Sequence, residues 1–97
     1  MAKFGDLIDN EVPVLIEFYK TGKDNSTSES VLTTVAQRLK EKTRVVRIDI
    51  KKNMQLAEAL KIEALPTLVI YQKGEMVWRK SGFLSAQDLI SELKKLM

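Results

Sequence analysis

The 97-residue sequence contains no cysteine and no histidine. Without cysteine, the chain has no disulfide, no thiolate nucleophile and no thiolate metal ligand. Without histidine, it also lacks the imidazole base and the commonest ligand of transition metals. Carboxylates, hydroxyls and amines remain, which is a small set of catalytic groups for so short a chain. We therefore predict neither a metal nor a cofactor.

Long apolar runs and a strong excess of one charge are also missing. No stretch approaches the roughly 20 apolar residues of a membrane span, so we expect no membrane association. The 16 Lys and Arg residues exceed the 13 Asp and Glu residues by only three and are interspersed with them, which argues against a nucleic-acid partner. The first residues do not resemble a secretory signal, so we expect a cytoplasmic protein.

The residues that are present predict one α/β domain over residues 1–97. Dense apolar or alternating runs predict strands at 12–19, 44–50, 65–71 and 76–80. Pro13 lacks an amide donor and is expected at the entrance of the first strand. A polar loop at 20–28 precedes a helix, whose predicted inward stripe comprises Val31, Leu32, Val35, Ala36 and Leu39.

Three positions predict helix starts. Ser26 and Glu29 fit a capping box at the start of the first long helix. Asn53 is a candidate cap for a short helix that turns Leu56, Ala57 and Leu60 inward, and Ser85 for the last helix. The predicted inward positions of that last helix are Leu89, Ile90, Leu93 and Leu96. A short helix or an irregular lead-in is expected at 4–8.

The resulting order is β-α-β-α-β-β-α after the lead-in. The first two strands must be parallel and joined by a right-handed crossover. The last two strands are joined by a tight turn at 73–75 and must be antiparallel. We therefore predict a mixed four-stranded sheet with helices on both faces.

With these elements in place, the sequence resembles the thioredoxin family over almost its whole length. The resemblance rests on the order and spacing of 14–19, 31–36, 46–50, 62–68, 74–75 and 82–85. Its most specific part is Leu65-Pro66-Thr67-Leu68 followed by a Gly-Glu hairpin, because the family carries a cis-proline at that position. The resemblance implies a thioredoxin-like fold.

The chain departs from the family at the redox motif. Thioredoxins carry a Cys-x-x-Cys pair, which counting from Tyr19, at the family's tryptophan, places on Lys23 and Ser26. Counting back from Val31 shifts both positions by one residue, because the loop is one residue shorter. Disulfide exchange requires a thiolate, so this chain is not expected to act as a thioredoxin-type reductase.

Glu17 lies inside an apolar strand, where an ionised carboxylate is costly. Thioredoxins carry a buried Asp at the matching place, accompanied by a Lys at the position of Arg47. Glu17 and Arg47 are therefore either a retained acid–base pair or a partly buried ion pair. With no thiol to serve, we favour the structural interpretation.

The family also implies a groove that binds extended peptides. The backbone of Leu65, before Pro66, matches the pairing edge, and Ile50, Ser81, Gly82 and Phe83 match other groove positions. We predict a monomeric, redox-inactive module that binds a protein or peptide in an adaptor or chaperone-like role. Two alternatives stay open: a scaffold that uses another surface, and a thiol-disulfide oxidoreductase relative whose redox activity was lost or removed.

Overall fold

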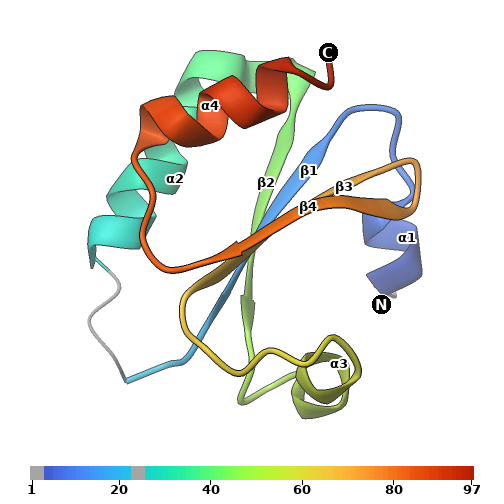
Figure 1. Ribbon diagram of the computed structural model, residues 1–97, viewed down its shortest axis with the longest axis vertical. Coiled ribbons are helices and arrows are strands. Elements are labelled where there is room, and N and C mark those ends of the chain that lie inside the picture. The colour runs from blue at the N-terminus through green and yellow to red at the C-terminus, as the bar shows by residue number, and fades with distance from the viewer. Residues whose placement is uncertain (1–3, 23–25) are drawn as a thin grey trace.

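The computed structural model describes residues 4–22 and 26–97 (Figure 1). Its strands are β1 (Val14–Tyr19), β2 (Arg44–Asp49), β3 (Thr67–Gln72) and β4 (Glu75–Ser81). Its helices are α1 (Phe4–Ile8), α2 (Ser26–Leu39), α3 (Met54–Ala59) and α4 (Ala86–Lys94), with a 3-10 turn, η1, at Lys40–Lys42. In the described ranges, no helix has the length and apolar character needed to cross a membrane.

The four strands form one mixed sheet in the order β2-β1-β3-β4. β1 is parallel to β2 and antiparallel to β3, which is antiparallel to β4. The predicted mixed four-stranded sheet is confirmed. The β3–β4 hairpin closes through two residues, Lys73 and Gly74, whose φ angles are 52° and 84°. Positive φ at both positions is the mark of a type I′ turn, whose twist matches that of the flanking strands.

Helices cover both faces of the sheet, as predicted. Alternate residues of β1 point to opposite faces, so Leu15 packs under α2 and α4, whereas Ile16 packs on the side of α1 and α3. Figure 1 shows α2 and α4 together on one side, with α1 and α3 apart from them. β1 and β3 are central strands buried on both faces, which explains their nearly continuous apolar sequences.

The predicted helix caps have different outcomes. Ser85 precedes α4, and its Oγ accepts a hydrogen bond from the Asp88 amide at 3.1 Å, as predicted. The cap predicted for Asn53 is wrong: it precedes α3, but its side-chain amide donates to the Asp49 carbonyl oxygen at 2.9 Å. For the predicted capping box, the side chain of Ser26 lies outside the described residues.

The predicted inward stripe of α2 is correct except at Ala36. Leu32, Val35 and Leu39 are buried, but Ala36 is exposed. Helical periodicity places Ala36 on the apolar side of the helix, yet the sheet ends at β2 and does not reach beneath it. The position of the sheet edge therefore decides this residue's exposure.

Candidate functional site

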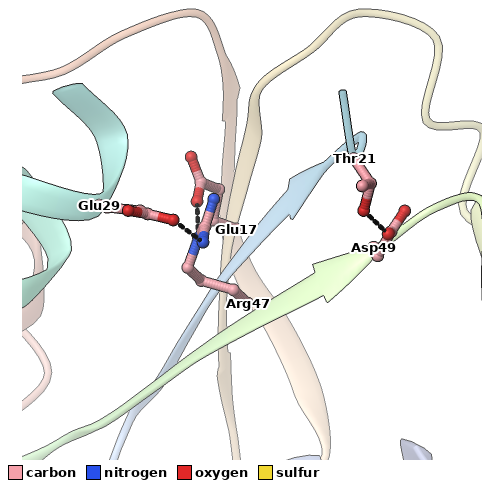
Figure 2. Close-up of polar contacts among 5 residues, drawn as sticks. All are labelled: Glu17, Thr21, Glu29, Arg47 and Asp49. Carbon is pink, nitrogen blue, oxygen red and sulfur yellow. Dashed lines mark hydrogen bonds and ion pairs between the residues drawn. The ribbon is translucent and has the colours of Figure 1, made fainter. Parts of the chain in front are cut away.

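An acid–base cluster lies where α2 begins, on the face of the sheet that α2 and α4 cover. Glu17 on β1 and Arg47 on β2 are register partners in the parallel pair, so their side chains rise from the same face. The Arg47 Nε donates to Glu17 Oε1 at 2.7 Å, and Figure 2 shows the two side chains facing each other. The structure thus brings together the two residues that the sequence paired.

The carboxylate of Glu17 is enclosed by the protein. Its side chain is 1% exposed, against 24% for Arg47. The second oxygen, Oε2, turns away from Arg47 in Figure 2 and has no hydrogen-bond partner among the described residues. Glu17 also lines a small cavity of about 10 Å³, which is near the minimum that holds one water molecule.

Arg47 is held by three groups at once. Besides Glu17, its Nη1 donates to the exposed carboxylate of Glu29 on α2 at 2.7 Å, and its guanidinium carbon lies 4.0 Å from the centre of the Tyr19 ring. Burial by itself lowers the pKa of Arg47, but the hydrogen bond and negative charge of Glu17, with help from Glu29, outweigh it and raise the pKa. The guanidinium is therefore a permanent cation that links β1, β2 and α2.

A second polar contact fixes the chain where it leaves β1. The Thr21 hydroxyl donates to Asp49 Oδ2, and the Lys51 amide donates to Asp49 Oδ1 at 2.9 Å. Figure 2 shows the Thr21–Asp49 contact at the ends of two neighbouring strands. The Thr21 hydrogen bond lowers the pKa of Asp49, because it stabilises the ionised carboxylate. This contact links the segment that follows β1 to the end of β2.

The third part of the site is formed by Pro66 and by the segment that follows β4. The Leu65–Pro66 peptide bond is cis, and the Gly82 amide donates to the Pro66 carbonyl oxygen at 2.9 Å. Gly82 has φ of 100°, a conformation that side chains other than glycine rarely adopt. The next residue, Phe83, is 65% exposed and lines the cavity beside Glu17 together with Pro66.

The cavity is otherwise apolar. Its remaining lining comes from α2, β3 and the region of α4, through Val31, Leu32, Leu68, Leu84 and Leu89. The site therefore combines a buried carboxylate, a fixed cation and an aromatic side chain exposed at the rim. Of these groups, Phe83 is the one whose side chain is exposed for contact with a ligand, because Glu17 is enclosed and Arg47 is engaged by Glu17 and Glu29. A nucleophilic thiol is absent because the sequence holds no cysteine.

Comparison with known proteins identifies the family. The family model described as Thioredoxin matches residues 1–95. The chain belongs to the thioredoxin family. Thioredoxin Y1, chloroplastic, of Arabidopsis thaliana is 36% identical over 89 residues, which are 91% of this chain and 52% of that protein. A thioredoxin-like protein of Synechocystis is 33% identical over 95 residues, which are 96% of this chain and 90% of that protein.

Solved thioredoxin structures share the fold. A mutant thioredoxin from Halobacterium salinarum superposes with a TM-score of 0.81 at 28% identity, over 93% of this chain and 78% of that one. Chloroplastic thioredoxin z gives 0.80 at 26% identity, over 90% and 80% of the two chains. The chain spans between half and three fifths of the length of the chloroplastic thioredoxins Y that it matches.

The thioredoxin resemblance places the redox pair on Lys23 and Ser26. Lys23 lies outside the described residues, as does the side chain of Ser26, the first residue of α2. Five of the predicted groove positions lie where the start of β3 pairs with the end of β4. They are Leu65, Pro66, Ser81, Gly82 and Phe83. Ile50 packs against the core cluster on the other face of the sheet, the one beneath α1 and α3.

Sequence reasoning missed two members of the cluster as partners of Arg47. The sequence predicts Glu29 as part of a capping box, and the thioredoxin resemblance marks Tyr19 only as the residue at the family's tryptophan position. The contacts join residues 18 and 28 positions apart, from a helix and a neighbouring strand. Local sequence carries no signal for such contacts, because the packing of α2 on the sheet creates the one with Glu29 and the pairing of β1 with β2 creates the one with Tyr19.

Proposed function

We propose that this thioredoxin-family domain binds extended protein or peptide segments at the groove beside Pro66 and carries out no redox step of its own. The observation that supports the proposal most is Phe83. This large apolar side chain is 65% exposed at the rim of a largely apolar cavity that Pro66 also lines. The carbonyl oxygen of Pro66 accepts a hydrogen bond from the Gly82 amide. Exposed aromatic residues beside a pocket are frequent energetic anchors in protein interfaces.

The geometry supports binding by main-chain pairing. Leu65 is half-buried and directly precedes the cis bond, where the thioredoxin resemblance implies contact with an extended peptide. An extended segment laid there gains main-chain hydrogen bonds, while its side chains contact the rim at Phe83. Recognition of this kind requires no thiol, so the absence of cysteine removes the chemistry and leaves the binding surface.

We also propose that the domain acts as a monomer. A cytoplasmic location stays a prediction. The plant relatives are chloroplastic thioredoxins, and that location belongs to those proteins.

A binding experiment with a thiol-blocked client tests the proposal. The probe is reduced, carboxymethylated lactalbumin, which stays unfolded and cannot form a mixed disulfide. We expect micromolar to millimolar binding, detected by fluorescence anisotropy of the labelled client. Phe83→Ala should weaken it by about tenfold, as for a residue that contributes more than about 1 kcal/mol to an interface.

Met54 provides the matched control, because its side chain is also large, apolar and exposed, at 71%, but lies on α3. Met54→Ala should change the affinity by less than about twofold. Equal losses for the two variants would mean nonspecific apolar adhesion. No binding by the unchanged protein would refute the proposal.

The alternative is an oxidoreductase relative that lost its redox pair or had it removed. The similarity of the chain to a thioredoxin and to a thioredoxin-like protein supports this alternative. A cysteine codon at either position 23 or position 26 in the source gene would favour it. Without such a codon, the chain holds no sulfur for the exchange step.

A further inference from the structure

The two edges of the sheet differ in how they are protected. β4 is one edge strand, and its pairing with β3 contains a register shift between Ile70 and Tyr71. Its exposed residues include Glu75, Arg79 and Lys80. Bulges and exposed charges of this kind hinder the addition of a further strand.

β2, the opposite edge, is regular. It pairs with β1 in an unbroken register from Arg44 to Asp49. Three of its six residues, Val45, Val46 and Ile48, are apolar and half-buried. Among the described strands none lies beyond β2, so its outer side is open to pairing.

The direction of the backbone groups on β2 follows from its pairing. The amide of Arg44 donates to the Pro13 carbonyl oxygen at 3.0 Å, and the amide of Ile50 donates to that of Tyr19 at 2.9 Å. Even-numbered residues of β2 therefore point their main-chain groups toward β1. The amides and carbonyls of the odd-numbered residues, Val45 and Arg47 above all, point outward.

A hollow of about 320 Å³ lies beside this open edge. It is lined by α2 and β2, through Glu29, Leu32, Thr33, Ala36, Val45 and Arg47. Ala36 is the residue whose place in the apolar stripe of α2 predicts burial but which is exposed. The apolar side of α2 thus extends past the sheet, over the place that one more strand would occupy.

Positive charge gathers where β2 begins. Arg38, Lys40, Lys42 and Arg44 are exposed, and Glu41 is the only acidic residue between the first and the last of them. Within residues 4–22 and 26–97, none of the four forms an ion pair. This end of the edge therefore favours acidic side chains.

From these observations we infer a second docking surface: the outer edge of β2 binds an extended segment of a partner protein that alternates apolar and acidic residues. The main chain of the segment pairs with Val45 and Arg47. Its apolar side chains enter the hollow over Ala36, and its acidic side chains lie on the face of Arg44, the opposite face of the strand. A second copy of this chain fits less well, because it brings its own Arg44 and Arg47 to the same edge.

The test uses three capped heptapeptides. The first, Glu-Val-Glu-Val-Thr-Val-Glu, matches the surface, the second replaces each Glu with Lys, and the third is the first with every amide N-methylated. Titrated into the ¹⁵N-labelled protein, the first should shift the amide resonances of Val45 and Arg47. The other two should shift them much less, because one carries the wrong charge and the other cannot donate main-chain hydrogen bonds.

Two charge reversals locate the surface. Arg44→Glu should weaken binding of the acidic peptide about tenfold, and the loss should shrink at high salt. Lys80→Glu, the same change on the opposite edge, should alter it by less than about twofold.

Four results would overturn the inference: no shift at millimolar peptide, equal binding of the N-methylated peptide, shifts confined to the Pro66 groove, or concentration-dependent shifts at β2 without peptide. The third of these supports the proposed function while removing the second surface, so the two proposals fail separately. The fourth identifies self-association as the use of this edge.

Discussion

Removing Arg47 tests whether the buried carboxylate depends on its partner. Arg47→Met keeps much of the side-chain volume but leaves Glu17, 1% exposed, as a charge without its cation. Breaking one side of a buried pair costs about 3–5 kcal/mol. Because Arg47 is 24% exposed and water reaches it, we expect the lower end, a loss of about 3 kcal/mol in the free energy of unfolding.

The double variant Glu17→Gln with Arg47→Met isolates the cause. It loses the same stacking on Tyr19 and the same contact with Glu29 as the single variant, so these effects cancel in the comparison. Without a buried charge, what remains is an imperfectly paired amide, which costs about 1–2 kcal/mol. We therefore expect the double variant to be more stable than the single Arg47→Met variant.

Urea unfolding, followed by the fluorescence of Trp78, the single tryptophan, measures the free energy of unfolding of the unchanged protein, the single variant and the double variant. Glu29→Gln serves as the control, because the ion pair of a carboxylate that is 58% exposed is worth less than about 0.5 kcal/mol. Equal losses in the single and double variants would refute the reasoning, since they would show that the packing of Arg47, and not its charge, supports Glu17.

Three further changes test other features. Lys73→Asn should stabilise the hairpin by about 0.5–1 kcal/mol, because asparagine tolerates the left-handed conformation of the type I′ turn better than lysine does; an unchanged urea midpoint would contradict this. Thr21→Val should raise the pKa of Asp49 in an NMR titration, because the hydroxyl holds that pKa low. The variant should be less stable than the unchanged protein at neutral pH. The difference in the free energy of unfolding should vanish as the pH falls below the pKa of Asp49 in both the folded and the unfolded chain. A loss of stability that is equal at all pH values would show that the ionisation of Asp49 does not cause it. Replacing Lys23 and Ser26 with Cys should give insulin reduction well below that of a true thioredoxin, with a thiol that titrates below about 8.5; failure of the pair to form a disulfide would show that the loop has diverged.

Much of the fold could be predicted from the sequence, because it depends on local pattern. The runs that became β1 and β3 are short and nearly continuously apolar, which is typical of strands buried on both faces. The hairpin at Lys73 and Gly74 and the cap at Ser85 follow from residue types that suit a turn or a helix start. The absence of a redox thiol is a matter of composition alone.

The tertiary structure decided which side chains meet and which surfaces stay open. Arg47 bonds to Glu29 because α2 packs over β2, and Asn53 contacts the Asp49 carbonyl instead of capping α3 because the turn before that helix brings the two together. Ala36 is exposed because the sheet ends at β2. Periodicity along one element tells which face is apolar; only the positions of the neighbouring elements determine whether anything covers it.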